Sequence, residues 1–289
     1  MNSFIISTDS GCDLPLSYCR NHGIPVLRMQ YEMDGQSFAE TIQDEDLSVF
    51  YRKMAQGASV HTSAINVEEY LSFWEPLLGQ PVVHIAMGSG ISSSYQNAML
   101  ARTVLLERHP DAELHVIDSL GACMAYGMQV VEAVQQRENG VSAAACTDKL
   151  SDFRHHCNAI YTTGDLEYLY KGGRVSRAGM FISRTLNIWP VLNLNDKGEL
   201  RVIDKCRGKS RAYRRVCEII ADTAISPEQQ TLFVCHSDAP EAAAEFAAQI
   251  RQTCGFREVV CSQIGTTIGA HTGPGLVTAF FYGKPRLPG

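Results

Sequence analysis

The sequence predicts an α/β fold of two domains: an N-terminal three-layer domain with a parallel sheet, and a C-terminal α/β domain with a mixed sheet. Three observations support this prediction. A chain of 289 residues is long enough for two domains. Apolar strand-like runs alternate with helical patterns in the first half, which is typical of a parallel sheet covered on both faces. The second half contains a hairpin signal, and hairpins pair strands antiparallel.

Strands and helices alternate through the first half of the chain. The apolar runs FIIS, IPVLRMQYEM, PVVHIAM and LHVID predict strands at residues 4–7, 24–33, 81–87 and 114–118. Apolar residues at helical spacing predict helices over residues 44–56, 67–78, 95–107 and 127–138. Asn66 followed by Glu69 forms a capping-box-like start for the second helix, and Gly57 and Gly140 can end the first and the last.

The second half has a different pattern. The runs PVLNL and ELRVID, residues 190–194 and 199–204, are separated by NDKG, which predicts a hairpin. Helices over 210–224 and 240–252 alternate with strands at 231–235 and 257–263. The change of pattern places the domain boundary near residues 150–160. We therefore expect domains of residues 1–155 and 156–289.

Composition narrows the class of protein. A formal net charge of -6 and a pI near 5.8 give no global electrostatic reason to expect nucleic acid as a partner. No apolar run reaches the roughly 18 residues of a spanning helix, and the start of the chain does not read as a signal peptide. The ten cysteines are scattered without a C-x-x-C pair, so we expect reduced thiols and no metal site. The expected location is the cytoplasm.

Four segments combine polar side chains with glycine or follow a strand. They are STDSGCDLP with Asp9 and Ser10, HTSAINVEEY with Thr62 and Ser63, MGSGISSSYQNAMLA with Ser92, Ser93 and Ser94, and GTTIGAHTGPG with His271. Strand ends are where parallel α/β sheets place ligands. Each residue also has a structural interpretation: Asp9 as a turn residue, the hydroxyls as caps, and His271 as a structural histidine in a loop.

The serine segment lies where a strand leads into a helix. The first amides of a helix lack intrahelical partners, and the peptide dipoles add partial positive charge there, so anions bind. Ser92 and Ser93 add hydroxyl donors, while Gly88 and Gly90 allow a ligand to approach the backbone. His271 can donate to a carboxylate or a phosphate, or transfer a proton.

Two basic segments stand out on this acidic chain. YKGGRVSRAG contains Lys171, Arg174 and Arg177, and DKCRGKSRAYRR contains Lys205, Arg207 and Lys209. The planar fork of arginine suits phosphate, so these segments indicate a phosphate-handling surface or a docking site for an acidic partner. A solvated helix face is the alternative interpretation, especially for Arg214 and Arg215.

These segments, in this order, resemble the DegV family of bacterial fatty-acid-binding proteins. The likeness rests on STDSGCDLP, TSAINVEEY, SGISSSYQNA, VIDS, TTGDLEYLYKGGRVS, KCRGKSRA and IGAHTGPG, and it extends over essentially the whole chain. Two departures occur: the family often has T-S-x-P-S where this chain has TSAIN, and S-G-L-S-G-T-Y where it has SGISSSY. Asn66 can still cap its helix, whereas Ser93 replaces a glycine and narrows backbone freedom.

The resemblance implies a lipid carrier. Thr62, Ser63, Ser92, Ser93 and His271 would hold the carboxylate of a long-chain fatty acid, and an apolar tunnel, for which residues 178–192 are candidates, would hold its tail. In some family members the protein presents the fatty acid to a separate ATP-dependent fatty acid kinase subunit. Arg174 and Arg207 match positions associated with that partner and with the transferred phosphate. No cofactor is implied, and transient membrane contact is compatible with such a carrier.

Two enzyme classes are alternatives. A hydrolase or transferase acting on an acyl substrate would use a serine with His271 and Asp9 as a triad. Ser89 lies between two glycines, but Met87 and Ile91 occupy the outer positions of a G-x-S-x-G elbow. A kinase acting alone would need a phosphate-binding loop of the form G-x-x-x-x-G-K-[ST], and YKGGRVS lacks that spacing.

Overall fold

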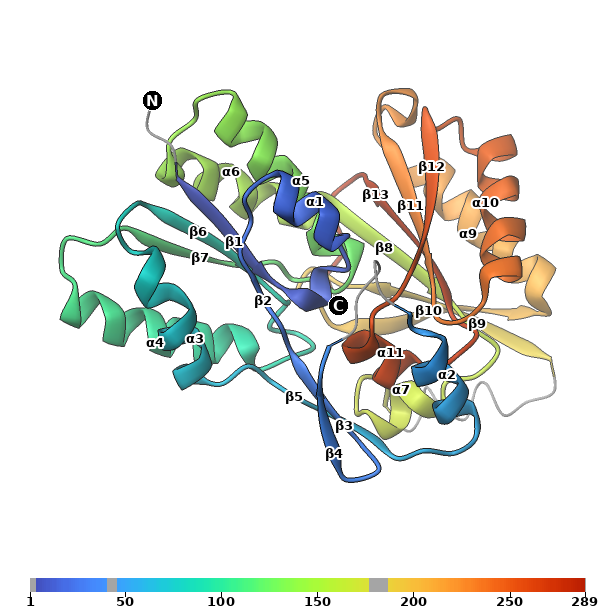
Figure 1. Ribbon diagram of the computed structural model, residues 1–289. Helices are drawn as coiled ribbons and strands as arrows, with labels where there is room; N and C mark the ends of the chain where they lie inside the picture. Colours follow the sequence, from blue (N-terminus) through green and yellow to red (C-terminus); the bar gives the residue numbers. More distant parts are fainter. Residues whose placement is uncertain (1–3, 41–45, 177–186, 289) are drawn as a thin grey trace.

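The chain folds around three β-sheets (Figure 1). The structure is a computed structural model and describes residues 4–40, 46–176 and 187–288. A four-stranded parallel sheet comes from the first part of the chain, and a six-stranded mixed sheet comes from the last part. A three-stranded antiparallel sheet lies below both in the view of Figure 1. The mixed α/β fold class is therefore confirmed.

The parallel sheet has the strand order β2-β1-β6-β7. Its strands are β1 (Ile5–Asp9), β2 (Val26–Leu27), β6 (Val82–Ala86) and β7 (Leu114–Asp118). Helices α3 (Val67–Trp74) and α4 (Ser94–Arg108) lie on one side, and α5 (Met124–Glu138) and α6 (Ala143–His156) lie on the other. Strand β6 is buried along its whole length, which explains its largely apolar sequence.

Local signals set the ends of two predicted helices. Asn66 and Glu69 form the expected capping box at the start of α3. This helix stops at Trp74 and continues as a 3-10 turn over Glu75–Leu77, which contains Pro76, so the prediction of a helix to residue 78 was too long. Helix α2 (Ser48–Ala55) ends before Gly57, which has a positive φ of 95°, as predicted.

The prediction of one strand over residues 24–33 was wrong. The chain leaves the parallel sheet after β2 and enters the antiparallel sheet as β3 (Gln30–Met33), between β4 (Gln36–Ala39) and β5 (Val60–Ser63). The backbone N–H of Met29 donates to Ser10 Oγ at 2.9 Å, and the Met29 side chain is buried at the change of direction. The ten residues predicted as one strand thus contribute strands to two different sheets.

The mixed sheet has the order β10-β9-β8-β13-β11-β12. Strands β9 (Ile188–Leu194) and β10 (Leu200–Arg207) form the predicted antiparallel hairpin. The remaining strands are β8 (Cys157–Thr162), β11 (Thr231–His236), β12 (Glu258–Gln263) and β13 (Val277–Tyr282). Helices α9 (Lys209–Thr223) and α10 (Pro240–Thr253) cover one face. Both helices were predicted, whereas β8 and β13 were not.

Helix α5 lies between the two large sheets. It contacts β1 and β6 on one side and β8 and β13 on the other. Because it is covered by sheets on both sides, it buries residues around most of its circumference, as Tyr126, Gln129 and Val130 illustrate. One hydrophobic core therefore runs from the parallel sheet into the mixed sheet.

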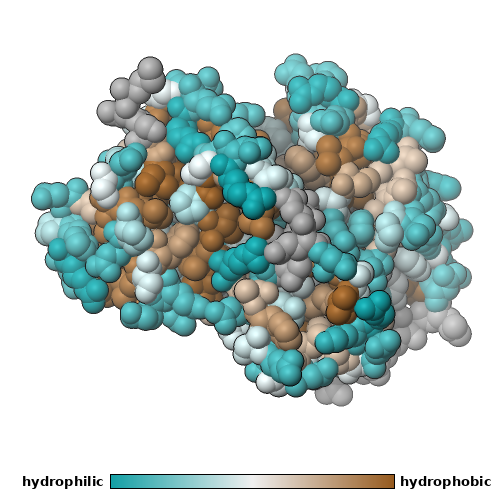
Figure 2. Space-filling model, viewed as in Figure 1, coloured by the Kyte–Doolittle hydropathy of each residue, from teal (hydrophilic) through white to brown (hydrophobic). Residues whose placement is uncertain are grey.

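Charged and polar residues dominate the visible outer surface. Figure 2 shows them over the outer faces of α4 and α10, with apolar residues gathered between the elements. A notch separates the lobe that carries α5 and α6 from the lobe that carries β11 and β12 in this view. In the described part of the chain, no helix has both the length and the apolar character needed to cross a membrane.

Candidate ligand-binding site

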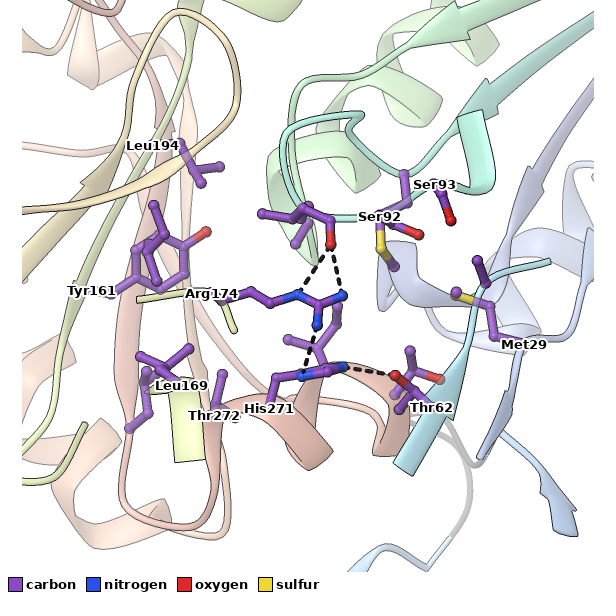
Figure 3. Close-up of a pocket in the computed structure, with 18 of the residues that line it drawn as sticks. Met29, Thr62, Ser92, Ser93, Tyr161, Leu169, Arg174, Leu194, His271 and Thr272 are labelled. Atoms are coloured by element: carbon purple, nitrogen blue, oxygen red, sulfur yellow. Dashed lines mark hydrogen bonds between the residues drawn. The ribbon is translucent and has the colours of Figure 1, made fainter. Parts of the chain in front are cut away.

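A cavity of about 280 Å³ lies where the three sheets meet. Its polar residues include Thr62, Ser63, Ser92, Ser93, Arg174 and His271, and Figure 3 shows all of these except Ser63 with labels. Its apolar residues include Met29, Met87, Tyr161, Leu169, Leu194 and Leu276. The structure thus brings together all five residues of the expected carboxylate cradle, from segments up to 209 positions apart.

Thr62 and His271 form the central contact of the polar end. Thr62 is near the end of β5, and its Oγ1 lies 2.7 Å from His271 Nε2. Burial, and then the charge of Arg174, lowers the pKa of His271 to about 4, so the ring is neutral near pH 7. Because an Arg174 nitrogen faces Nδ1, the ring proton belongs on Nε2 and is donated to Thr62. The hydroxyl proton of Thr62 is then available for a ligand.

His271 lies on a helix, which corrects the expectation that a loop holds it. Residues Thr266–Thr272 form α11, and its C-terminal residues bring the ring into the cavity. The ring packs against Gly172, just after α7 (Glu167–Lys171). A Cβ at Gly172 would lie 2.3 Å from His271 Nδ1, so only glycine leaves room for the imidazole here.

Arg174 connects the histidine with the serine loop, residues 87–94. Its Nε and Nη2 donate to the carbonyl oxygen of Ile91 at 3.1 and 2.8 Å, and its Nη1 donates to the carbonyl of Gly172. Nη1 also lies 3.5 Å from His271 Nδ1. A guanidinium remains charged even when partly buried, so Arg174 supplies positive charge to the polar end. The sequence assigned Arg174 only to a partner surface, so its place in the cavity was missed.

Three serines of the loop, Ser92, Ser93 and Ser94, have different positions. Ser92 Oγ accepts from the backbone N–H of Ser94 at 3.2 Å and lies 3.0 Å from Ser94 Oγ. Ser94 is buried, and its Oγ accepts from the N–H of Ile65 at 3.1 Å. Since Ile65 follows β5, Ser94 ties the serine loop to the segment that carries Thr62. Ser93 is exposed at the edge of the cavity.

Glycines allow the serine loop to touch the β9–β10 turn. A Cβ at Gly90 would lie 2.5 Å from the backbone carbon of Gly198, in a turn where Gly198 has a φ of 75°. Backbone cannot move aside as a flexible side chain can, so both positions require glycine. This contact fixes the serine loop, which follows the parallel sheet, against the mixed sheet.

The apolar part of the cavity differs from the expected tunnel wall. Of the candidate residues 178–192, those at 178–186 lie outside the described residues, and those at 187–192 do not line the cavity. Apolar side chains from β8, β9 and α7 line it instead, together with Met29 and Met87. Met87 follows directly after β6, and the general rule on strand ends could have identified it.

The residues of the alternative triad do not meet. Ser89 Oγ donates to Asp118 Oδ2 at 2.6 Å, and Asp9 accepts from the hydroxyl of Tyr126 at 2.5 Å. His271 instead contacts Thr62 and Arg174. A serine nucleophile requires a base within hydrogen-bond reach, oriented by a third group, and Ser89, His271 and Asp9 do not form that arrangement.

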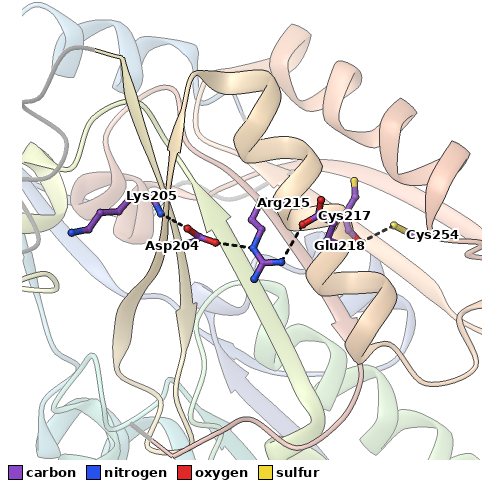
Figure 4. A network of polar contacts seen from close by, with 6 residues as sticks. All are labelled: Asp204, Lys205, Arg215, Cys217, Glu218 and Cys254. Carbon is purple, nitrogen blue, oxygen red and sulfur yellow. Dashed lines mark hydrogen bonds and ion pairs between the residues drawn. The ribbon is translucent and has the colours of Figure 1, made fainter.

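A second, more polar groove of about 670 Å³ adjoins the cavity. The two share Ile91, Arg174 and Leu200, and the groove adds Arg201 and Lys205 from β10. Arg207 is exposed at the end of β10 and lines neither space. Arg215, on α9, instead pairs with Asp204 at 2.7 Å and with Glu218 at 3.1 Å. Figure 4 shows these ion pairs, which support the interpretation of Arg215 as part of a solvated face.

Comparison with known proteins places the chain in a family. The family model described as "Uncharacterised protein, DegV family COG1307" matches residues 3–284. A DegV domain-containing protein of Clostridium perfringens is 30% identical over 291 residues, covering 100% of both chains.

Solved structures share the fold over the whole length. The Thermotoga maritima protein TM841, described as revealing a fatty acid binding function, is 25% identical with a TM-score of 0.81, covering 98% of this chain and 100% of that one. The Streptococcus pneumoniae fatty acid kinase B3 protein loaded with linoleic acid is 18% identical with a TM-score of 0.84, covering 97% and 99%. With a family model and a relative that both span the chain, the protein belongs to the DegV family.

Proposed function

We propose that this protein binds a long-chain fatty acid, with the carboxylate at Thr62, Ser63, Ser92, Ser93 and His271 and the tail against the apolar wall. The observation that carries the proposal is the division of one cavity into a polar end with hydroxyl, imidazole and guanidinium groups and an apolar remainder. The binding of fatty acids by solved relatives supports the same class of ligand.

Affinity and orientation come from different parts of such a site. Each buried methylene contributes about 0.8 kcal/mol, so the tail supplies most of the binding free energy. The few polar groups fix the direction of the ligand and select a carboxylate. Neither task requires a metal, a general base or a nucleophile, which fits a carrier better than an enzyme.

We expect the purified protein to carry one fatty acid per chain in native mass spectrometry. After extraction of the lipid, the delipidated protein should bind added oleate at a single site, in competition with the original ligand. Oleyl alcohol, which has the same unsaturated tail but no carboxylate, is the matched control and should bind more weakly. Equal affinity for oleate and oleyl alcohol, or no binding of oleate, would contradict the proposal.

The carrier would present its ligand to a separate ATP-dependent fatty acid kinase subunit. Arg174 contributes to both the ligand cavity and the polar groove, so the carboxylate end of the ligand would lie beside a basic surface with Arg201 and Lys205. Such a surface is suited to a phosphate group or to an acidic partner. The name of the fatty acid kinase B3 protein among the solved relatives supports this partner class.

Arg207 provides a test of this partnership. We expect Arg207→Ala to leave oleate affinity unchanged and to slow the formation of acyl phosphate by a kinase subunit several-fold, because exposed charges at an interface mainly affect association. Arg214→Ala is the matched control, since Arg214 is an exposed arginine on α9. Phosphorylation that is equally fast with both variants would remove Arg207 from the docking surface.

A further inference from the structure

Two buried carboxyl groups hold the segment in which α11 begins. Asp13 follows the 3-10 turn Ser10–Cys12, and its Oδ1 accepts from the backbone N–H of Gly265 at 2.9 Å. Glu40 follows β4, and its Oε1 accepts from the N–H of Thr267 at 3.0 Å, while Ser10 Oγ donates to its Oε2. Both residues are fully buried, and the proposed function uses neither. The start of α11 is therefore bound to distant parts of the chain.

The same helix carries His271. Thr267 and His271 are four residues apart, so they lie on one face of α11, and both line the ligand cavity. Tyr51 adds a neutral anchor, since its hydroxyl donates to the carbonyl oxygen of Ile264 at 2.8 Å. A shift at the beginning of this short helix would move the imidazole away from Thr62.

The two carboxyl groups also influence each other electrostatically. Burial, and then the nearby charge of Asp13, raises the pKa of Glu40 to about 8. Burial raises the pKa of Asp13 to about 7, against the effect of its hydrogen bonds. The pair therefore holds protons near neutral pH and loses them as pH rises through 7 to 8.

The groups around this pair add little compensating charge. Arg28 donates to the backbone carbonyl of Glu40 at 3.2 Å, whereas the Glu40 carboxyl faces Ser10 and Thr267. The other titratable groups that interact with Asp13 or Glu40 are thiols and phenols whose pKa values are raised by burial: Cys12, Tyr51, Cys123, Tyr126, Tyr161 and Cys235. Further along α11, neutral His271 faces Arg174 and Thr62.

We propose that Asp13 and Glu40 are positioning residues for His271, and that ionisation of this pair lowers the affinity of the cavity for an anionic ligand. The inference rests on the proposed function, since it concerns the same site. When Asp13 and Glu40 are protonated, they hold the beginning of α11 in place and add little negative charge near the cavity. When Glu40 is ionised, its negative charge lies beside Thr267, which lines the cavity, and this charge repels a bound carboxylate. Affinity for the anion should therefore fall as pH rises from 6 to 9.

The test compares Glu40→Gln with Glu40→Ala in oleate titrations of the delipidated protein between pH 6 and 9. Glutamine can accept from Thr267 and donate to Ser10, so it keeps the position of α11 and removes the titration of Glu40, while Asp13 still titrates. We expect Glu40→Gln to match the wild-type affinity at pH 6 and to exceed it roughly tenfold at pH 9. Glu40→Ala should lose affinity at every pH. The ratio of variant to wild-type affinity cancels any titration of the ligand itself.

Tyr51→Phe is the matched control, because it removes an uncharged anchor of the same segment. It should reduce affinity by the same factor at every pH. A Glu40→Gln profile parallel to that of the wild type would overturn the inference while leaving the proposed function intact. A wild-type protein that binds no oleate at pH 6 would instead contradict the proposed function.

The positioning role of Asp13 and Glu40 can be tested without any ligand. The ring nitrogen signals of His271 in the ligand-free protein should be preserved in Glu40→Gln and shifted in Glu40→Ala. If Glu40→Ala does not fold, Asp13→Gly replaces it, because it also removes an acceptor from the beginning of α11 and glycine adopts the positive φ of 53° at this position; the His271 signals should shift in it as well. Unchanged His271 signals in Glu40→Ala would overturn the positioning role.

Discussion

Replacing His271 with alanine is expected to weaken oleate binding by roughly 10- to 100-fold. The variant loses the Nε2–H that donates to Thr62 Oγ1 at 2.7 Å, so the threonine hydroxyl is no longer oriented towards the ligand. Hydrogen bonds to charged groups contribute about 1.5–3 kcal/mol, and each 1.4 kcal/mol corresponds to about a tenfold change in affinity. Isothermal titration of the delipidated variant measures the loss directly.

A double-mutant cycle with Thr62→Val separates this role from a general loss of packing. Because Thr62 and His271 act through one hydrogen bond, the double variant should bind oleate with about the same affinity as whichever single variant binds it more weakly. Thr62→Ser keeps the hydroxyl and should retain most of the affinity. His61→Ala, at the exposed neighbouring position of β5, should have no effect. Strictly additive losses would show that the two residues act independently of each other.

The residues of the candidate site were easier to predict than their arrangement. Thr62, the serine loop and His271 could be singled out as candidates because their hydroxyl and imidazole groups lie before a predicted helix, after a predicted strand or among glycines, and the family resemblance then assigned them to a carboxylate site. Arg174 was assigned to a different surface because its main acceptor is the carbonyl oxygen of Ile91, 83 positions away. No local pattern marks such a contact, since every residue has a backbone carbonyl. The apolar wall was missed for a related reason, because Tyr161 and Leu194 look the same in sequence whether they face a cavity or a packed core.

Helix α11 shows why one element was mistaken for a loop. Its sequence TTIGAHT combines β-branched residues with Gly269, which are poor helix formers. The helix exists because tertiary contacts stabilise it: Asp13 and Glu40 accept from Gly265 and Thr267 at its beginning. The predicted elements that the structure confirmed instead carry a pattern in their own sequence: β6 is a buried, largely apolar run, and α10 has apolar residues at helical spacing.

Arg174→Ala is expected to weaken oleate binding at least tenfold and to raise the pKa of His271. The guanidinium donates twice to Ile91 in the serine loop and once to Gly172, so its loss leaves these carbonyls without their donors and frees the loop. Arg174 is also a positive charge beside the imidazole, and such a charge disfavours the imidazolium. Burial, the larger cause of the low value, remains in the variant, so the pKa of His271 rises only part of the way from about 4 towards its ordinary value, and an NMR titration of the ring measures the change.

Arg174→Lys distinguishes the geometry of this residue from its charge. Lysine keeps the positive charge but presents a single ammonium group, which cannot reproduce the fork that holds Ile91 and Gly172. We therefore expect Arg174→Lys to bind oleate nearly as weakly as Arg174→Ala, while the pKa of His271 stays low. Lys171→Ala is the control, since Lys171 pairs with Glu167 at 2.8 Å on the exposed side of α7 and does not line the cavity. Full affinity in Arg174→Lys would mean that Arg174 serves the site as a charge alone, and that the serine loop keeps its position through Ser94 and Gly90.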